Sequence, residues 1–595
     1  MKTIALICLL CLASSGAYGR QPNVLLIQTD DLGYDDLSLH GNTCSETPNL
    51  DRLGRSSVRF RNFMVNSVCS PTRAALLTGR DAWRTGCEGL HAGKEFIHLN
   101  ERTFADAFQE AGYATGMWGK WHNGKSDGYW PWDRGFDEAY FADLYKYYPS
   151  AGYYNEFPRK TIHEGEWSPK VLADYTIDFI TKNQDRPFLA YLSFLTCHST
   201  WNTPDEYRSK YLERGHSEAF SMLLGMLEFM DSEVGRVLQH VADLGLDENT
   251  IVIFMSDNGP NKAGSRRHAS DIVTDEEWEL RNNHGFLGNK SKLWQNGIKS
   301  PLFIRWQGVY EPVDVDRLVT IADVFPTLHD ITGIALADGL PLDGRSFRPY
   351  LEGNTTLLPE KQAVFAHWHP AWEGDHFDPL QDKTELAFED QKLTLVNERY
   401  KFIQNEYGVP GSPAQHNRMV LIDLVNDPLE SDNLASSRPE VVAEIREELA
   451  AWFDGLIESP HAFTHTVFQV GWNGRERSEF PAFGPSKTVG TKNEGHAIGK
   501  WDVAGNYAEY RIHVHEAGPH EVFVLCAAGT RGEGIEMRVE CDGQSTTAVL
   551  SDAVAPSLGV LELPAGEHTI KLSVIDIPDG LSPNVRFRAI QLNLQ

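Results

Sequence analysis

Cysteine is scarce in this chain. Eight cysteines occur among 595 residues, and two of them fall within the first 20. So small a number excludes a domain that is held together mainly by disulfides. Two pairs remain as candidate bridges, Cys44 with Cys87 and Cys526 with Cys541.

Positive charge is also in deficit. The chain has 54 Lys and Arg residues against 83 Asp and Glu residues, a formal net charge of −29. This balance argues against nucleic acid as a partner, because nucleic-acid-binding proteins present basic surfaces. An excess of negative charge repels polyanions in solution, so an anionic substrate would need a locally basic pocket.

Long apolar runs are absent after the N-terminus. No segment reaches the roughly 18 apolar residues of a membrane-spanning helix, so we expect no transmembrane segment. The N-terminus itself has a basic Lys2, an apolar run over 4–13 and the small residues Ala17 and Gly19 around a cleavage point. This pattern predicts a signal peptide over 1–19 and a secreted or periplasmic protein, with a lipid anchor at Cys11 as the weaker alternative.

Strand and helix patterns alternate through the first 330 residues. Apolar runs predict buried strands, and amphipathic stretches between them predict helices. The strands are 24–28, 113–118, 188–195 and 251–255, and the helices are 104–112, 171–183 and 219–245. The alternation predicts an α/β fold with a mixed, mostly parallel sheet sandwiched by helices, which we assign to a domain over 20–359.

The character of the sequence changes twice towards the C-terminus. From about residue 360, three short segments resemble antiparallel strands, and a helix is expected over 439–459. We assign this part to a small antiparallel α+β subdomain over 360–460. From 465 to 595, short alternating strands are separated by turns rich in Gly, Pro and Asp, which predicts an appended β-sandwich domain.

Polar side chains follow four of the predicted buried strands. In an open α/β sheet, ligands bind at the carboxyl ends of the strands. Taken singly, each residue has an ordinary explanation as a turn, a helix cap or a solvated side chain. Their coincidence at four strand ends favours a common site. They are Asp30 and Asp31, Lys120 and His122, His198, and Asp257 and Asn258.

The chemistry of these side chains points to a metal and an anion. Asp30, Asp31, Asp257 and Asn258 supply only oxygen ligands, and no Cys/His spacing of a zinc site is present. Oxygen ligands select a hard cation such as Ca²⁺ or Mg²⁺. The cationic or protonatable side chains would neutralise an anionic tetrahedral group bound against that metal. They are Arg73, Lys120, His122 and His198.

Cys69 stands at a predicted helix start. Ser70 can cap the helix, and Pro71 fits its first turn. A thiol at a helix N-terminus tends to be reactive. Half of a disulfide is an equally good explanation of this cysteine from the local sequence alone.

Together these segments resemble a type I sulfatase of the alkaline phosphatase superfamily. The C-x-P-x-R signature that begins at Cys69 is highly specific for that family. The matching segments follow the family's order over about 22–455, and include PNVLLIQTDDLGYDD (22–36), TPNLDRL (47–53), CSPTRAALLTGR (69–80), GYATGMWGKWHNG (112–124), RGFDE (134–138), SDNG (256–259) and LIDLVNDPLESDNLA (421–435).

The resemblance implies how Cys69 acts. In that family, a separate formylglycine-generating or maturase enzyme oxidises the signature cysteine to Cα-formylglycine. One hydroxyl of the hydrated aldehyde attacks sulfur, and the other then expels sulfate. The family also implies Ca²⁺, rather than Mg²⁺, held by Asp30, Asp31, Asp257, Asn258 and residue 69.

The resemblance assigns the remaining roles as well. Arg73 would orient the formylglycine, Lys120 and His122 would contact it, and His122 would be the base for sulfate release. His198 would contact sulfate and donate a proton to the leaving oxygen.

Lys290 matches a second sulfate-binding lysine of the family. The segment 290–299 departs from the usual pattern, so Lys292 is a competing candidate.

The expected substrate is a sulfated glycan or polysaccharide. The 465–595 domain resembles the glycan-binding modules of secreted carbohydrate enzymes. Trp472 and Trp501 are candidate sugar-stacking residues, with a core position as the equal alternative for either. A purely structural cap is the alternative for this domain, and the stretch 260–286 could form a substrate loop. Two other functions stay open at this point. One is a phosphonate or phosphate ester hydrolase of the same superfamily, and the other is a degenerate glycan-binding protein.

Overall fold

The structure is a computed structural model that describes most of the chain after residue 20. The predicted signal peptide over 1–19 therefore lies outside the described residues. The described residues are 21–595 without 92, 143–149, 156–160, 264–271, 336–338, 340, 367–382, 384–385, 407–418, 495–496, 552 and 582. Among them, no helix has both the length and the apolar character needed to cross a membrane.

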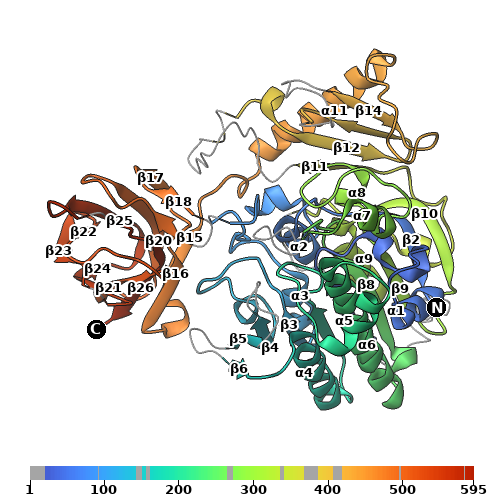
Figure 1. The fold of residues 1–595 in the computed structure, drawn as a ribbon, viewed down its shortest axis with the longest axis horizontal. Helices are drawn as coiled ribbons and strands as arrows, with labels where there is room; N and C mark the ends of the chain where they lie inside the picture. The colour runs from blue at the N-terminus through green and yellow to red at the C-terminus, as the bar shows by residue number, and fades with distance from the viewer. Residues whose placement is uncertain are drawn as a thin grey trace, which may run out of the picture.

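A ten-stranded mixed sheet forms the centre of the larger part of the molecule (Figure 1). Its strands are β1 (Asn23–Thr29), β2 (Val58–Met64), β3 (Ala114–Gly119), β4 (Glu138–Ala142), β5 (Ser150–Tyr154), β6 (Thr161–His163), β7 (Phe188–Ser193), β8 (Thr250–Ser256), β9 (Leu302–Trp306) and β10 (Val313–Thr320). They lie in the order β10-β2-β9-β8-β1-β7-β3-β4-β5-β6. The central strands β8, β1, β7, β3 and β4 are mutually parallel, so their carboxyl ends meet at one edge.

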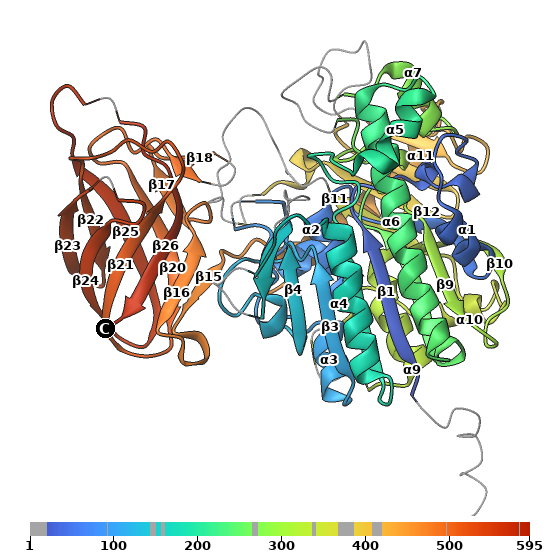
Figure 2. The same cartoon turned by 60° about the horizontal axis from the view of Figure 1, so that its bottom comes forward.

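Helices cover both faces of this sheet. Leu25 and Ile27 of β1 pack into one buried cluster, whereas Val24 and Leu26 pack into another on the opposite face. This explains why the strand reads as a continuous apolar run. Figure 2 shows α4 and α6 running across one face. The helices are α1 (Pro48–Arg55), α2 (Cys69–Thr78), α3 (Phe104–Glu110), α4 (Ser168–Asn183), α5 (Asp205–Glu213), α6 (Glu218–Asp243), α7 (Asp275–Arg281), α8 (Gln295–Ile298), α9 (Val324–Thr332), α10 (Arg348–Leu351) and α11 (Pro439–Ile457).

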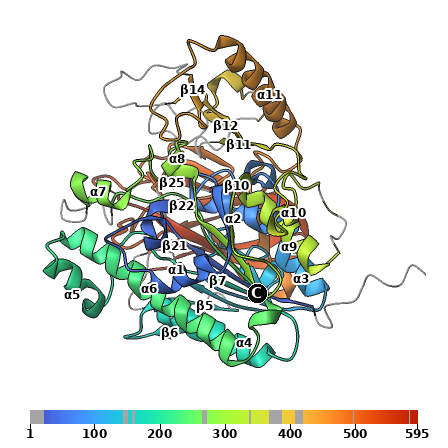
Figure 3. The same ribbon diagram turned by 90° about the vertical axis from the view of Figure 1, so that its right-hand side faces the viewer.

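A small antiparallel sheet with one long helix follows the main sheet in the chain. The strands pair in chain order, and α11 lies along them (Figure 3). Leu449 of α11 shares a buried cluster with Leu395 and Phe402 of the small sheet. The strands are β11 (Gln362–Ala366), β12 (Leu393–Asn397), β13 (Tyr400–Ile403) and β14 (Val420–Asp423).

The C-terminal strands form two facing sheets with a shared apolar core, hereafter the sandwich. One sheet has the order β15-β20-β25-β22-β23 with β17 beside β20, and the other has the order β18-β19-β26-β21-β24 with β16 beside β26. Residues of β20 alternate between buried and half-buried, as expected for a strand with one face on a core. The strands are β15 (Val467–Val470), β16 (Arg477–Pro481), β17 (Lys487–Val489), β18 (Lys492–Asn493), β19 (Ile498–Gly499), β20 (Tyr507–Val514), β21 (Gly518–Cys526), β22 (Glu536–Cys541), β23 (Gln544–Val549), β24 (Ser557–Leu563), β25 (Gly566–Asp576) and β26 (Phe587–Leu594).

The predicted fold class is therefore confirmed. A mostly parallel sheet between helices is followed by a small antiparallel sheet and a β-sandwich. The structure bears on two further details of the sequence-based expectation: the cysteine pairings, which are wrong, and the positions of two tryptophans.

The first concerns the cysteines. All six cysteines of the described residues are unpaired. Cys526 and Cys541 lie on β21 and β22, which belong to different sheets of the sandwich. Cys87 is buried with its sulfur 3.1 Å from the Ser70 hydroxyl, so its position is that of a small core residue.

The second concerns the two tryptophans. Trp501 is 1% exposed in the sandwich core, and its ring N–H donates to the Ile498 carbonyl. Trp472 packs against Gly128 of the larger part, because a Cβ on that glycine would lie 3.4 Å from the Trp472 ring. Trp501 is therefore a core residue and cannot present a face to a sugar. Trp472 is half-buried at the contact between the two parts of the molecule, and its role in sugar stacking stays a prediction.

Candidate active site

The helix α2 brings Cys69 to the carboxyl edge of the main sheet. Cys69 is the first helical residue, as expected, but the N-cap is Val68 rather than Ser70. The Ser70 hydroxyl is used elsewhere, since it donates to the His122 carbonyl at 2.7 Å. The prediction that Ser70 caps the helix is therefore wrong, because its hydroxyl bonds to a residue distant in the chain. The thiol itself is 1% exposed, and burial raises the pKa of Cys69.

Four predicted ligands converge beside this thiol. Asp30 and Asp31 follow β1, Asp257 and Asn258 follow β8, and all four are fully buried. The Asn258 amide donates to Asp31 Oδ1 at 2.8 Å, and the Asp31 N–H lies 3.2 Å from Asp257 Oδ1. The Cys69 sulfur and carboxylate oxygens of Asp30 and Asp257 all lie within 4.8 Å of one another.

Three oxygens of this cluster lack a hydrogen-bond partner. They are Asp30 Oδ1, Asp31 Oδ2 and Asn258 Oδ1, each buried. A buried polar atom without a partner costs about 1–3 kcal/mol, so such atoms are rarely left without a role. Buried, unpartnered oxygens from carboxylates and an amide suit a hard divalent cation.

Three cationic side chains surround the carboxylates. The Lys120 ammonium contacts Asp30 Oδ2 and lies 3.9 Å from Asp257 Oδ2. The Arg73 guanidinium donates twice to Asp257 Oδ2, at 2.9 and 2.7 Å. The Lys290 ammonium lies 2.6 Å from Asp31 Oδ1. Three cationic side chains thus face three carboxyl groups within one buried cluster.

Burial and the neighbouring charges shift the pKa values of Asp30 and Asp31 in opposite directions. Burial, together with the neighbouring Asp257 carboxylate, raises the pKa of Asp30 to about 8. Burial also disfavours the ionised form of Asp31, but the positive charge of Lys290 outweighs this effect and holds the pKa of Asp31 below its usual range. A bound cation would favour the ionised form of both groups.

His122 bridges residue 69 and a distant loop. Its Nδ1 lies 3.3 Å from the Cys69 sulfur, and its Nε2 lies 3.1 Å from the Leu90 carbonyl. A carbonyl can only accept, so Nε2 carries the proton and Nδ1 presents a lone pair to residue 69. Burial, together with Lys120, lowers the pKa of His122 well below its usual value and keeps the ring neutral.

His198 lies beside the two aspartates that follow β1. A ring nitrogen of His198 lies within 4.8 Å of carboxylate oxygens of Asp30 and Asp31. Its Nδ1 is 2.6 Å from the Ser199 carbonyl, so Nδ1 carries the proton in the neutral ring and Nε2 is an acceptor. Burial and the positive charge of Lys290 lower the pKa of His198 well below its usual value.

The structure distinguishes the two candidate lysines. Lys290 reaches Asp31, whereas Lys292 lies near enough to Lys392, the residue before β12, to help lower the pKa of Lys392. All the predicted site residues other than Lys292 therefore lie around one cluster.

The sequence analysis missed the groups that hold these side chains in place. Arg73 Nη1 donates to the Ser193 hydroxyl at 2.6 Å and to the Lys120 carbonyl at 3.0 Å. Ser193 ends β7, so the rule that polar residues follow buried strands could have found it.

A second supporting group comes from the predicted substrate loop. Arg281, the last residue of α7, pairs with both Asp36 oxygens at 2.7 Å and lies 3.3 Å from the Asp31 carbonyl. This part of 260–286 anchors the backbone of a candidate metal ligand, and residues 264–271 of the same stretch fall outside the described residues.

Comparison with known proteins agrees with this arrangement. The family model described as "Sulfatase" matches residues 22–334. Arylsulfatase A of Homo sapiens is 30% identical over 478 residues, covering 74% of this chain and 89% of that protein. N-acetylgalactosamine-6-sulfatase of Canis lupus familiaris is 29% identical over 455 residues, covering 66% and 82%.

A solved structure shares the fold. Ps i-CgsB, crystallised in complex with k-i-k-neocarrahexaose, is 21% identical, covers 73% of this chain and 93% of its own, and has a TM-score of 0.60. The family match spans more than half of the chain and contains every residue of the buried cluster. The chain belongs to the sulfatase family and is a hydrolase of sulfuric esters.

Proposed function

We propose that this sulfatase acts on sulfated glycans outside the cytoplasm, with a formylglycine at residue 69 and Ca²⁺ in the buried cluster. The observation that carries the proposal is the set of three buried, unpartnered oxygens of Asp30, Asp31 and Asn258 beside Cys69. We also propose that the chain divides into a signal peptide (1–19), the catalytic α/β domain (20–359), the α+β subdomain (360–460) and the sandwich (465–595).

The donor set supports both the metal and the modification. Asp30, Asp31, Asp257 and Asn258 would hold Ca²⁺ through hard oxygen ligands. A cysteine sulfur is a soft ligand and suits this set poorly. An oxygen at residue 69 would make the set uniform, and the hydrated aldehyde would supply both that oxygen and a nucleophile for sulfur.

The charge balance supports binding of a sulfate ester. Lys120, Lys290 and Arg73 match the charge of the three carboxyl groups when all three are ionised. A divalent cation would leave an excess of two positive charges, which attracts the negative sulfate ester despite the net charge of the chain. Lys120, Lys290 and His198 would then contact the sulfate oxygens.

His122 would act as the base at residue 69. Its Nδ1 faces residue 69, and the Leu90 carbonyl holds the proton on the other nitrogen. A neutral ring with a lone pair at this position can accept the proton of a hydroxyl on residue 69.

His198 would act as the acid for the leaving oxygen. The neutral ring carries its proton on Nδ1, so this role requires a second proton on Nε2. The negative charge of a bound sulfate ester favours that protonated form.

The substrate class and location rest on other observations. N-acetylgalactosamine-6-sulfatase is a relative, and Ps i-CgsB was crystallised with an oligosaccharide. The pattern over 1–19 predicts export from the cytoplasm. A formylglycine-generating or maturase enzyme acting in trans would be the partner that modifies Cys69.

Peptide mass and turnover test the proposal together. Conversion of Cys69 to formylglycine lowers the mass of its peptide by about 18 Da, the difference between a thiol-bearing and an aldehyde-bearing side chain. The modified protein should release sulfate from sulfated oligosaccharides, and Cys69→Ala should not. Full activity from a protein whose peptide carries only the unmodified thiol would falsify the mechanism.

A further inference from the structure

The ring of His122 is held by a tight turn that comes from outside the main sheet. We call residues 88–91, 93 and 94 the Leu90 turn. The Glu88 and Gly89 N–H groups both donate to the Lys94 carbonyl, at 2.8 and 3.0 Å. The Leu90 carbonyl lies 3.1 Å from His122 Nε2, so the position of the turn decides the tautomer and direction of the ring.

The far side of the Leu90 turn is held by the sandwich. The Thr466 hydroxyl, directly before β15, donates to the Gly93 carbonyl at 2.7 Å. Gly93 has a left-handed backbone with φ of +81°, and a Cβ there would lie 3.2 Å from the Cα of Gly484. The turn is therefore in direct backbone contact with the sandwich at Gly484.

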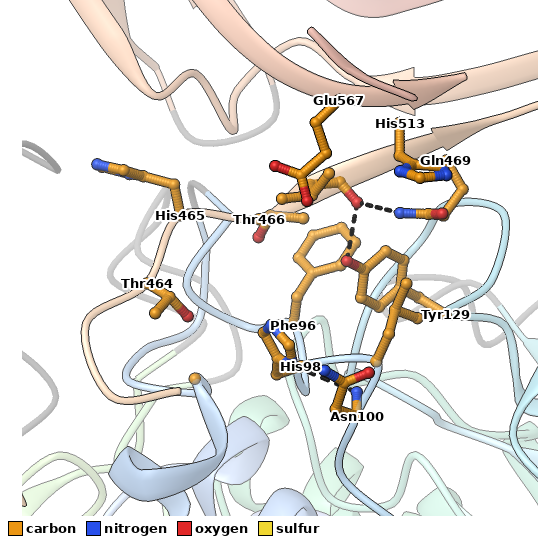
Figure 4. A pocket seen from close by; sticks show the side chains of 13 residues that line it. Phe96, His98, Asn100, Tyr129, Thr464, His465, Thr466, Gln469, His513 and Glu567 are labelled. Carbon is orange, nitrogen blue, oxygen red and sulfur yellow. Dashed lines mark hydrogen bonds between the residues drawn. The ribbon is translucent and has the colours of Figure 1, made fainter. Parts of the chain in front are cut away.

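The sandwich is also docked firmly beside the turn. Phe96 and Tyr129 of the larger part are buried within the sandwich core, and the Tyr129 hydroxyl donates to the Val467 carbonyl at 2.9 Å (Figure 4). Arg475 pairs with Asp127 and Asp133.

A cavity of about 220 Å³ lies at the same boundary (Figure 4). Its lining includes His98, His465 and His513, but these do not form one of the groups of close metal-binding side chains found among the described residues. Thr466, which donates to the Gly93 carbonyl of the turn, also lines this cavity.

We infer that the sandwich positions His122 for catalysis, through Thr466 and Gly484 and the Leu90 turn. The inference rests on the proposed role of His122. A shift of the turn by about 1 Å would weaken the Leu90 hydrogen bond and turn the ring away from residue 69, which lowers kcat. Thr466 and Gly484 are positioning residues, because neither touches the reacting atoms.

This role differs from both expectations for the sandwich. A glycan-binding module would change KM for a polymer and leave a small substrate unaffected. A cap that only stabilises the fold would change the melting temperature and leave kcat unaffected. Positioning of His122 lowers kcat on small and polymeric substrates alike, with KM unchanged.

Substitutions of Thr466 test the inference. Thr466→Val removes the donor and keeps the shape, whereas Thr466→Ser keeps the donor. Thr491→Val is a matched control, because the Thr491 hydroxyl donates to the Tyr507 carbonyl within the sandwich. With rates normalised to the fraction of modified residue 69, Thr466→Val should lower kcat about fivefold, the effect of one lost hydrogen bond. Thr466→Ser and Thr491→Val should keep the wild-type kcat.

A second variant and a second readout strengthen the test. Gly484→Ala would place a Cβ 3.3 Å from the Gly93 Cα and 3.0 Å from the Phe468 ring, so it should displace the turn and also lower kcat. In protein labelled with ¹⁵N-histidine, the Nε2–H signal of His122 should weaken or shift in Thr466→Val and Gly484→Ala only.

Two results would separate failure of this inference from failure of the proposed function. If both variants keep the wild-type kcat and His122 signal while His122→Ala is inactive, the positioning inference is wrong and the proposed function stands. If His122→Ala is itself fully active, the proposed function fails, and the positioning inference fails with it.

Discussion

Replacing Asp30 by asparagine should stabilise the protein in the absence of divalent cations. Burial and Asp257 raise the pKa of Asp30 from 3.8 to about 8, so the metal-free fold keeps this proton where the unfolded chain releases it. Stability of the metal-free fold therefore falls as the pH rises from about 4 to about 8. At about 1.4 kcal/mol per pH unit, the group removes about 4 kcal/mol between pH 3.8 and pH 7. Asparagine does not ionise, and its carbonyl can still accept from Lys120.

Calcium should reverse this advantage. A bound cation stabilises the ionised carboxylate of wild-type Asp30, whereas Asp30→Asn offers a neutral ligand and binds the cation more weakly. Ligand binding stabilises the folded state by an amount that grows with concentration over Kd, about 2.7 kcal/mol at a hundredfold excess. Added Ca²⁺ should thus raise the free energy of unfolding of the wild type more than that of the variant.

Urea unfolding in a chelator at pH 5, 7 and 8, and with Ca²⁺ at pH 7, measures both effects. In the chelator, the variant should gain on the wild type as the pH rises. Asp247→Asn is a control, because that carboxylate pairs with Arg305 away from the site. A difference between wild type and Asp30→Asn that is the same at every pH and insensitive to Ca²⁺ would contradict the reasoning.

Three further substitutions address the catalytic roles and the sandwich contact. His198→Ala should slow hydrolysis of sugar sulfates far more than that of a nitrophenyl sulfate, because a sugar alkoxide needs a proton to leave; equal losses in kcat/KM would remove His198 from the acid role. Lys290→Ala should raise KM about 10- to 100-fold through loss of a charged sulfate contact, while Lys292→Ala should leave it within about twofold; steady-state kinetics with the opposite ranking would favour Lys292. Burial and the stacked His461 lower the pKa of His98 to about 4, so protonation of His98 in the unfolded chain destabilises the fold as the pH falls from 6.5 towards 4. His98→Gln should therefore lose less melting temperature than the wild type between pH 7 and pH 5, and equal losses would exclude His98 as a source of acid sensitivity.

The sequence alone determined the order of layers and the chemistry of the site. Uninterrupted apolar runs predict the buried strands, and polar residues directly after them predict the site. Both predictions work because they depend only on local composition. Asp30, Lys120, His198 and Asp257 were placed at one sheet edge in this way, and the structure brings them together. The signature that begins at Cys69 resembles that of the sulfatases, and this resemblance supplied the expected chemistry of the nucleophile.

Which side-chain atoms meet in the site depends on the tertiary structure. Serine is a residue type that favours helix caps, yet the Ser70 hydroxyl donates to the His122 carbonyl instead. Lys290 and Lys292 differ by two residues in the chain, and the fold of their loop alone directs Lys290 to Asp31. Thr466 contacts Gly93, 373 positions away, in the turn whose Leu90 carbonyl holds His122, because the sandwich packs there. Such pairings depend on the packing of distant segments, and no local pattern of residues carries that information.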